Sequence, residues 1–455
     1  MPPKSKRLVG RAWCVSLAGF ALLSLAACGS KSALPVHPGF APFVPRKSTI
    51  TSSAYIKHVI IIIQENRSLD NLFNGYPGAD TVQSGPRQDG SIVALKPTPL
   101  EAGIDVGHFH LSFLAAYNNG AMNGWDGENT FGITPKGYQP IPAPPDYEYG
   151  YVPQSEVQPY WQLAQGFTLA DRMFQSNSGP SYPAHQYLIA AQSADADEVP
   201  SSGPWGCDAP AGTTVSLLGP NGNDIPGPFP CFDYQTLGDE LDARNITWRY
   251  YAPQLNATGG LFSAYDAIRH IRYGPDWTTK VISPETTVLT DISAGSLQQV
   301  SWVVPSFPNS DHALAKSNTG PQWVSSIVNA VGASPYWNNT AILIMWDDWG
   351  GWYDHVSPSR LDPMGLGFRV PLLVVSPYAK HGYVSHVRHE FGSVLKFTEA
   401  TFGLATLNTS DARADDLTDC FDFSQTVKPF KAVRTTLSRS FFLSQPRSFD
   451  PPDPY

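Results

Sequence analysis

The chain has few charged residues, and acidic ones outnumber basic ones. Only 15% of its 455 residues are Asp, Glu, Lys or Arg, and the formal net charge is −9. An acidic balance argues against non-specific nucleic-acid binding, which needs a basic surface. Internal repeats and long low-complexity tracts are also lacking, and the 42% hydrophobic content excludes disorder of the whole chain. The length suits one large α/β domain with insertions, or two domains.

The apolar run at the N-terminus is too short for a transmembrane helix. Residues 12–27 are fewer than the ~20 that a bilayer crossing needs. A basic segment precedes the run and Leu-Ala-Ala-Cys28 ends it, an order that resembles a signal peptide with a bacterial lipobox. The resemblance implies removal of residues 1–27 and lipidation of Cys28, so that an exported protein is anchored to a bacterial membrane on its periplasmic or cell-surface side. The alternative is an ordinary signal peptide and a secreted protein.

Composition also suggests how the rest of the chain is divided. Residues 28–53 are rich in Gly, Ser, Lys and Pro, and we expect them to form a tether. Residues 54–430 are expected to form the folded domain and residues 431–455 a C-terminal tail, of which residues 445–455, with four prolines, are expected to be extended and lightly packed. Residues 195–235 are rich in Gly, Pro, Asp and Ser, which favours an inserted lid or loop region over the functional site.

Cysteine is scarce, with five in the chain. Besides Cys28, three would remain after cleavage. Cys207 and Cys231 flank a Gly/Pro-rich loop and are the best candidates for a disulfide in an exported protein. Cys420 would then be left over as a buried thiol, although its pairing with one of the other two stays open.

Strand-like and helix-like segments alternate along the domain. The strand-like segments are residues 57–64, 246–251, 300–304, 340–346 and 369–376. The helix-like segments are residues 155–165, 181–193, 235–243, 321–331 and 390–402. This alternation predicts an α/β fold with a mostly parallel central sheet, helices on both of its faces, and loop insertions over the site.

Two of the predicted strands end in side chains that bind metal ions. Asp347 and Asp348 follow the apolar run 341–345, and Glu65-Asn66 follows the β-branched run 59–63. Adjacent buried carboxylates repel each other and are costly to desolvate, and a metal ion is the simplest compensation. Because ligands bind outside the carboxyl ends of parallel strands, the two segments predict one shared metal site.

Ser181 is the candidate nucleophile. It follows a Gly-Pro turn signal and lies at the start of a predicted helix, where free backbone N–H groups bind phosphate. A serine held there beside a metal could attack phosphorus. Taken alone, Ser181 would more simply be read as a helix cap; the acidic pairs elsewhere favour the nucleophile.

Five sequence blocks are informative together. They are Glu65-Asn66-Arg67-Ser68-x-Asp70-Asn71-Leu72-Phe73; Asp105-x-x-His108 with Gly120-x-Met122-Asn123-Gly124-Trp125; Gly179-Pro180-Ser181-x-Pro183; Ser310-Asp311-His312; and Asp347-Asp348-x-Gly350-Gly351-x-Tyr353-Asp354-His355-Val356. In this order they resemble the blocks of the bacterial phosphoesterase family, which includes the non-zinc type of phospholipase C and a class of acid phosphatases. The matches span residues 57 to 425, and the resemblance implies an alkaline-phosphatase-like fold.

The resemblance also implies the metal ligands. Glu65, Asn66, Asp347 and Asp348 would bind one divalent metal ion, and Ser181 would complete its coordination as the nucleophile. The hard oxygen ligands suit Ca²⁺, Mg²⁺ or Mn²⁺, although Zn²⁺ also fits.

Other residues would act on the phosphate group. The resemblance implies that His108 and His312 hold phosphate oxygens or donate a proton to the leaving group. His270, in a looser local match, is a further candidate for the active site. Arg67 could bind phosphate with two hydrogen bonds, and a structural ion pair with Asp70 is the alternative.

The chain departs from the family pattern at one position. The family commonly has Asn three residues after the nucleophile, where this chain has Ala184. We therefore expect either that His185 serves as a phosphate donor and catalytic group in its place, or that turnover is slower. His185 also stands where a sulfatase needs Arg after the x-Pro-x sequence, which argues against a sulfatase.

The sequence thus predicts a metal-dependent phosphoesterase. It would hydrolyse phosphodiesters such as phospholipids, in the manner of phospholipase C, through a phosphoserine intermediate. One alternative is an acid phosphatase that acts on phosphomonoesters. A second alternative is a lipoprotein that binds a phosphorylated ligand without turnover, which only Ala184 favours.

Overall fold

The structure is a computed structural model that describes residues 52–253 and 263–448. The predicted signal peptide, Cys28 and all but the last two residues of the predicted tether lie outside the described residues, as do residues 449–455 of the predicted tail. None of the helices in the described part has the length and apolar character that a membrane crossing requires.

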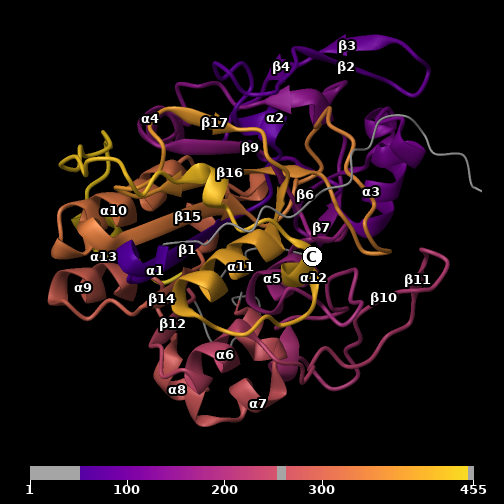
Figure 1. Cartoon of the computed structure of the whole chain (residues 1–455). Coiled ribbons are helices and arrows are strands. Elements are labelled where there is room, and N and C mark those ends of the chain that lie inside the picture. Colours follow the sequence, from indigo (N-terminus) through magenta and orange to yellow (C-terminus); the bar gives the residue numbers. More distant parts are fainter. Residues whose placement is uncertain (1–51, 254–262, 449–455) are drawn as a thin grey trace, which may run out of the picture. The chain divides into compact units, whose positions relative to one another are not determined.

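A nine-stranded sheet forms the centre of the folded unit. Its strands follow the order β13-β12-β14-β1-β15-β16-β9-β17, with β18 also paired to β9, and Figure 1 shows this order from β17 at the top to β12 at the bottom. The strands are β1 (His58–Gln64), β9 (Thr168–Phe174), β12 (Trp248–Tyr251), β13 (Val281–Ile282), β14 (Val300–Val303), β15 (Thr340–Trp346), β16 (Arg369–Val375), β17 (Tyr383–Ser385) and β18 (His389–Glu390).

The sheet is mostly parallel, as the alternation of strands and helices predicts. Strand β16 is the exception, since it runs antiparallel to both β15 and β9. Residues 347–368, which join β15 to β16, contain no helix. A parallel pairing needs a crossover connection, usually a helix, so β16 returns antiparallel beside β15.

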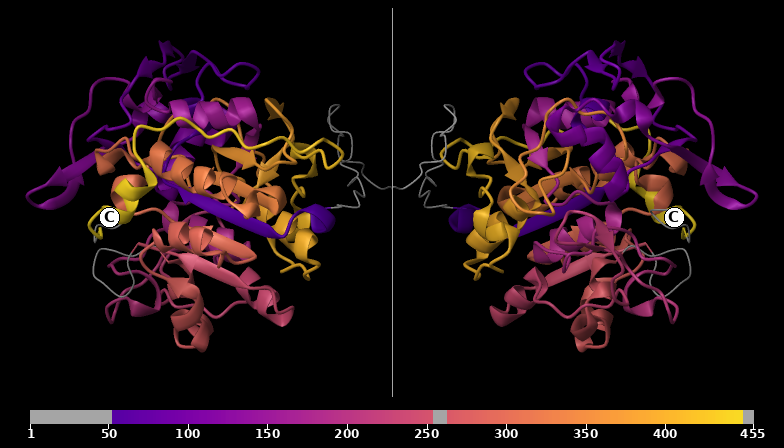
Figure 2. Two further views of the ribbon diagram at one scale, coloured as in Figure 1. Left: turned by 90° about the vertical axis from the view of Figure 1, so that its left-hand side faces the viewer. Right: turned by 90° about the vertical axis from the view of Figure 1, so that its right-hand side faces the viewer.

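Helices cover both faces of the sheet (Figure 2). One group packs α4, α9 and α10 together, and another packs α5, α6 and α11, with α11 in front of the sheet in Figure 1. The helices are α1 (Ser52–Tyr55), α2 (Leu69–Leu72), α3 (His110–Tyr117), α4 (Gln158–Gly166), α5 (Ser181–Ala190), α6 (Leu237–Ala243), α7 (Arg269–Arg272), α8 (Pro275–Lys280), α9 (Thr287–Ala294), α10 (Gly320–Gly332), α11 (Phe391–Phe402), α12 (Ser410–Arg413) and α13 (Arg439–Ser444). The predicted α/β fold with helices on both faces is therefore confirmed.

Short strands outside the main sheet form three two-stranded sheets and one three-stranded sheet in the connecting segments. They are β2 (Ser84–Pro86), β3 (Ile92–Ala94), β4 (Lys96–Pro97), β5 (Asp105–Val106), β6 (Thr130–Thr134), β7 (Gly137–Pro140), β8 (Gly150–Tyr151), β10 (Leu217–Leu218) and β11 (Asp224–Ile225). Most of them lie between β1 and α4, in a long insertion that carries Asp105 and His108.

The predicted disulfide is present. Cys207 is bonded to Cys231, and Cys420 is a buried free thiol. The bond closes part of the segment 195–235, whose Pro230 carbonyl accepts a hydrogen bond of 3.1 Å from the Tyr182 hydroxyl. The segment thus contacts the residue next to Ser181, and its role as a lid remains a prediction.

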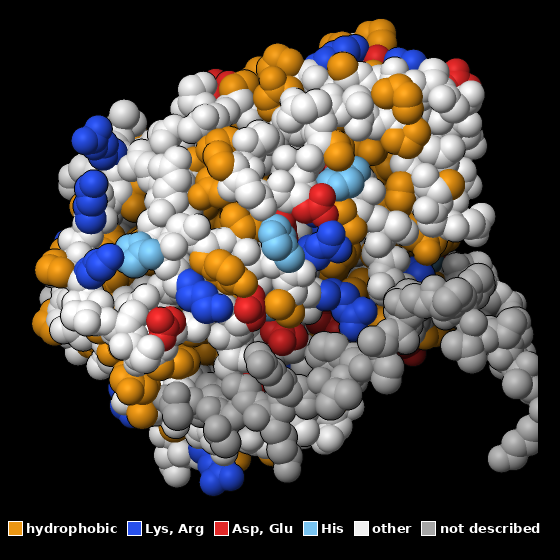
Figure 3. Space-filling view, turned by 45° about the horizontal axis from the view of Figure 1, so that its top comes forward, with side chains coloured by type: hydrophobic (Ala, Val, Ile, Leu, Met, Phe, Trp, Pro, Cys, Tyr) orange, Lys and Arg blue, Asp and Glu red, His pale blue; other side chains and the backbone are white. Residues whose placement is uncertain are grey.

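Charged and apolar side chains are mixed on the surface. On the face shown in Figure 3, basic, acidic, histidine and hydrophobic side chains are interspersed. This face therefore creates no strong field of one sign.

Glu399 is expected to make the stability of the protein depend on pH. Its side chain lies in α11 and is only 5% exposed. Burial, followed by the charge of Asp411, raises the pKa of Glu399 to about 8. Because the folded state binds this proton more tightly than the unfolded state, the stabilisation is complete below the unfolded pKa and is lost as the pH rises through about 8. We predict that Glu399→Gln raises the free energy of unfolding relative to wild type at alkaline pH, and much less at mildly acidic pH.

Urea unfolding of both proteins across this pH range would measure the difference. The exposed residue Glu101 provides the control, because Glu101→Gln should leave the pH profile of stability unchanged. If Glu399→Gln raised the free energy of unfolding equally at all pH values, ionisation of Glu399 would not be the cause of the difference.

Candidate active site

The acidic side chains meet where β1 and β15 end. The two strands are parallel neighbours with Gln64 opposite Trp346, so both carboxyl ends lie at one edge of the sheet. Asp347 donates its backbone N–H to the Gln64 carbonyl at 2.9 Å, and Asn66 donates its own to Asp347 Oδ1 at 3.1 Å. The structure thus brings Glu65-Asn66 and Asp347-Asp348 together, as the rule for parallel strands predicts.

Backbone geometry at this edge of the sheet explains why glycine stands at position 350, two residues after Asp348. Asn66 has a φ of 58°, a left-handed conformation that Asn tolerates better than most residues. Gly350, with a φ of +62°, packs directly against it, and a Cβ there would lie 2.1 Å from the Asn66 carbonyl oxygen. A larger residue than glycine would force the two loops apart.

Ser181 reaches the same edge from β9. Since β9 and β15 are both antiparallel to β16, they run in the same direction, and the chain leaving β9 begins α5 at Ser181. The Ser181 hydroxyl donates to Asp348 Oδ2 at 3.0 Å, and the Asn66 side-chain amide donates to Ser181 Oγ at 3.4 Å. Ser181 is fully buried at the first helical position, where backbone N–H groups have no partner within the helix.

The three carboxylates of this site are all fully buried. Burial and the negative charge of Asp347 raise the pKa of Asp348 well above its usual value. Burial opposes ionisation of Asp347 as well, but hydrogen bonds from His185, Ser181 and the Asn66 backbone lower its pKa overall. Glu65 adds a third carboxyl group at zero exposure. Such a concentration of buried oxygen ligands fits one divalent cation, which would offset their charge.

His185 lies among the carboxylates. Its Nε2 is 3.3 Å from Glu65 Oε1 and 3.4 Å from Asp347 Oδ2, and the three residues form a group that could hold a metal ion. Burial lowers the pKa of His185, which keeps the ring neutral and able to bind a metal. The phosphate-binding role that the sequence predicts for His185 stays a prediction. Its place beside Ser181 could have been found from the spacing of four residues, which puts both on one face of α5.

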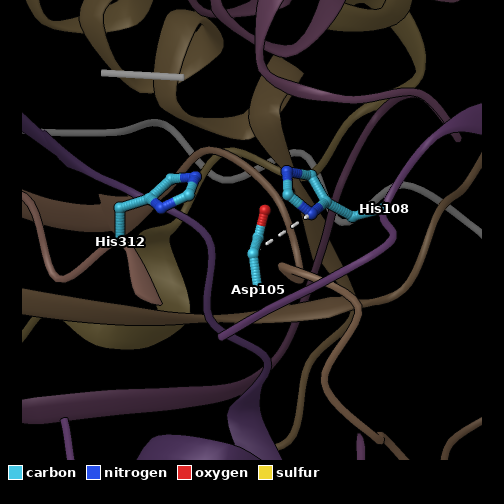
Figure 4. A group of neighbouring side chains, drawn as sticks. All are labelled: Asp105, His108 and His312. Carbon is cyan, nitrogen blue, oxygen red and sulfur yellow. Dashed lines mark ion pairs between the residues drawn. The ribbon is translucent and has the colours of Figure 1, made fainter. Parts of the chain in front are cut away.

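Two further histidines flank Asp105 (Figure 4). His108 and His312 have ring centroids 6.0 Å apart, and these three residues form a second group that could hold a metal ion. His108 Nδ1 bonds to the Val106 carbonyl at 2.7 Å and its Nε2 bonds to the Asn66 amide nitrogen at 2.8 Å. Since a carbonyl only accepts, the His108 proton is assigned to Nδ1. Asn66 therefore links this group to Ser181.

His312 is neutral at physiological pH. It is fully buried, and burial lowers its pKa to about 4. Its Nδ1 accepts a hydrogen bond from the Leu314 backbone N–H at 3.2 Å, so the proton is assigned to Nε2. The ring can donate a hydrogen bond through Nε2, but it is a poor source of a proton. Asp105, not named as a site residue from the sequence, could have been found from its Asp-x-x-His spacing.

Arg67 makes different contacts from the ion pair with Asp70 that was the alternative prediction. It is fully buried, its Nε donates to the Asp311 carbonyl at 2.9 Å, and its Nη2 donates to the Leu100 carbonyl at 3.2 Å. The guanidinium also lies 5.0 Å over the Trp352 ring. Asp70 instead lies 3.5 Å from the guanidinium of Arg369. The alternative ion pair with Asp70 was wrong, and a phosphate contact by Arg67 stays a prediction.

The side-chain contacts of His270 are with residues outside the group around Ser181. It is on α7 with its side chain 39% exposed, and it contacts Asp233 Oδ1 at 2.6 Å and Asp239 Oδ1 at 2.9 Å. These contacts tie it to the start of α6 rather than to the surroundings of Ser181, and its predicted role in the site stays untested.

Comparisons with known proteins agree with this arrangement of motifs. The model of the phosphoesterase family matches residues 56–405. Hemolytic phospholipase C of Pseudomonas aeruginosa is 26% identical over 436 residues, which cover 81% of this chain and 56% of that protein. Phospholipase C B of Mycobacterium tuberculosis is 26% identical, with coverage of 83% and 79%. The chain thus spans little more than half the length of the first relative.

Among solved structures, a protein of the alkaline phosphatase superfamily from Vibrio parahaemolyticus is similar over 80% of this chain and 70% of its own. The TM-score is 0.37 and the sequence identity 12%. A score this low does not bear on function.

Proposed function

Because the chain belongs to the phosphoesterase family, we propose that it is a metal-dependent hydrolase of phosphoric esters that cleaves phosphodiesters with Ser181 as nucleophile. The hydrogen bond from Ser181 Oγ to Asp348 Oδ2 carries this proposal, because it joins a serine at a helix N-terminus to a buried acidic cluster. Relatives named phospholipase C support a phospholipid or similar diester as the substrate.

The acidic cluster is the proposed metal site. Glu65, Asp347 and Asp348 would hold one divalent ion, with Asn66 and Ser181 completing the set. When bound, the ion supplies positive charge that stabilises the serine alkoxide and the phosphoryl oxygens. Oxygen ligands suit Ca²⁺, Mg²⁺ or Mn²⁺, while the nearby His185 nitrogen would also suit Mn²⁺ or Zn²⁺.

The residues of the chain itself orient the attack. Asp348 Oδ2 would accept the Ser181 proton as Oγ bonds to phosphorus; the bond from phosphorus to the leaving oxygen breaks, and water protonates the departing alkoxide to the alcohol. The Asn66 amide holds Oγ in place, and the free N–H groups at the start of α5 bind phosphoryl oxygens. Water then hydrolyses the phosphoserine.

His312 is proposed to donate a hydrogen bond to an oxygen of the substrate rather than to transfer a proton to the leaving group. With its pKa at about 4, the neutral ring donates a hydrogen bond from Nε2 to a phosphoryl or leaving-group oxygen. The sequence left two roles open for His312, holding a phosphate oxygen or donating a proton to the leaving group, and the proposal selects a hydrogen bond without proton transfer. Membrane attachment through Cys28 also remains a proposal, motivated by the N-terminal sequence.

Hydrolysis of three chromogenic esters would test the proposal. The chain would be assayed on bis-(p-nitrophenyl) phosphate, p-nitrophenyl-phosphorylcholine and p-nitrophenyl phosphate, after chelation and after return of single metals. We expect chelation to abolish hydrolysis, one metal to restore it, and the diesters to be cleaved faster than the monoester. Faster cleavage of the monoester would indicate an acid phosphatase, and no turnover with any metal would indicate a ligand-binding protein.

A further inference from the structure

We propose that His110, Asp197 and Asp224 form a second divalent-cation site, which joins the segment 195–235 to α3. The site is distinct from the acidic cluster at Ser181, and the inference does not depend on the proposed hydrolysis. Its cation is of the class that combines imidazole with carboxylate ligands, represented by Zn²⁺ and Mn²⁺.

Three segments distant in the sequence bring ligand atoms together. His110 is the first residue of α3, Asp197 follows α5, and Asp224 is the first residue of β11; α3 and β11 lie on the same side of the unit in Figure 1. His110 Nδ1 is 2.7 Å from Asp224 Oδ1 and 3.8 Å from Asp197 Oδ2. One ligand atom of each residue lies within 4.8 Å of the others, which suits a shared ion.

Asp197 is the observation that points to a ligand. Its side chain is 1% exposed, and neither of its carboxylate oxygens has a hydrogen-bond partner within residues 52–253 and 263–448. A buried carboxylate without such partners is costly unless a positive charge is near.

The surroundings provide too little positive charge. Glu198 also belongs to the group, since its Oε1 accepts the backbone N–H of His110 at 2.8 Å. Two carboxyl groups thus face the His110 imidazole and a third accepts its backbone N–H, and none of the ion pairs found in the described part of the chain joins them to Lys or Arg. A divalent cation balances this arrangement, and the nitrogen ligand favours Zn²⁺ or Mn²⁺ over Ca²⁺.

The proposed site lies next to two parts of the candidate active site, the turn before Ser181 and the segment that follows His108. Gly179 packs against Asp197 so closely that a Cβ there would lie 2.2 Å from the Asp197 carbonyl oxygen. Gly179 is two residues before Ser181, and His110 is two residues after His108. A cation here would act by positioning, because it would hold the turn before Ser181 and the start of α3 in one arrangement.

Counting the metal ions bound to the full chain would test the proposal. After dialysis against Zn²⁺ or Mn²⁺ and removal of free ion, elemental analysis should find at least two ions per wild-type chain, because Asp105, His108 and His312 form a further group that could hold one. Asp197→Asn and His110→Gln should each bind one ion fewer. Asp195→Asn is the matched control, because Asp195 is an exposed neighbour with a φ of 62° that Asn can adopt, and it should bind as wild type does.

A second variant separates the two sites. Asp347→Asn should lose the ion at Ser181 and keep the ion at His110, and its melting temperature should rise when Zn²⁺ is added. The double variant Asp347→Asn/Asp197→Asn should show no such rise. The proposal would be overturned if Asp197→Asn and His110→Gln fold and still bind as many metal ions as the wild-type chain. It would also be overturned by an Asp347→Asn chain that neither binds an ion nor gains stability from one, a readout that holds even if the other two variants do not fold.

Discussion

Replacing Ser181 by alanine is expected to lower kcat for phosphodiester hydrolysis by at least about a thousandfold. The substitution removes the oxygen that would attack phosphorus, together with its 3.0 Å hydrogen bond to Asp348. Steady-state rates on bis-(p-nitrophenyl) phosphate at saturating metal would measure the loss. Rapid quenching of the wild-type reaction and mass spectrometry should reveal phosphate on Ser181, and none should appear on the variant.

Ser178→Ala is a fitting control for that experiment. Ser178 is also buried, precedes Ser181 by three residues, and donates its hydroxyl to the Met364 carbonyl at 2.8 Å. Its loss should lower stability slightly and leave kcat within a few-fold of wild type. Wild-type turnover by Ser181→Ala, or phosphate on another residue, would remove Ser181 from the proposed role.

Asp347→Asn should weaken metal binding at the acidic cluster by at least about a hundredfold, since even outer contacts of metal sites cost ten- to a hundredfold. Asn preserves the shape of the side chain, and its oxygen can still accept the Asn66 N–H that now bonds to Oδ1 at 3.1 Å. The negative charge is lost, however, and an amide nitrogen then replaces Asp347 Oδ2, which lies 3.4 Å from His185 Nε2. Metal titration followed by calorimetry would measure the affinity.

Recovery at high metal concentration distinguishes a ligand from a merely structural residue. If Asp347 binds the metal, the hydrolytic rate of Asp347→Asn should rise as metal is added, with the half-saturation point shifted upward by the same factor. Asp89→Asn, on an exposed turn, should match wild type throughout. An unchanged affinity with reduced turnover would argue that Asp347 acts on something other than the metal.

Much of the fold could be predicted because several strands are apolar along their whole length. Strand β15 spans residues 340–346, as predicted, and β1 begins one residue later than predicted. Both are central parallel strands whose two faces are covered, so continuous β-branched and apolar runs mark them clearly. Strand β9 was missed, because Asp171 and Arg172 interrupt its apolar pattern. Asp171 is nevertheless buried, and its Oδ2 accepts the Asp80 N–H at 2.7 Å, a contact that local sequence does not reveal.

The site was predictable to a similar degree. Glu65, Asn66, Asp347 and Asp348 could be placed together because they follow parallel strands, and strand direction alone brings such ends to one edge. His185 was expected at the phosphate, and the structure places it between Glu65 and Asp347. Its position depends on how α5 packs against the sheet, which the spacing of residues does not specify.

The sequence by itself determined the α/β class, the approximate bounds of β1, β12, β14, β15 and β16, the acidic pairs that follow β1 and β15, and the family to which the motifs point. These properties depend on residue type and on spacing along a few neighbouring residues. Only the tertiary structure decided that β16 runs antiparallel, that Arg67 bonds to the Asp311 carbonyl, and that His110, Asp197 and Asp224 meet. Such contacts join residues far apart in the chain, so they depend on strand order, loop paths and helix packing, and these are settled by the burial of the core as a whole.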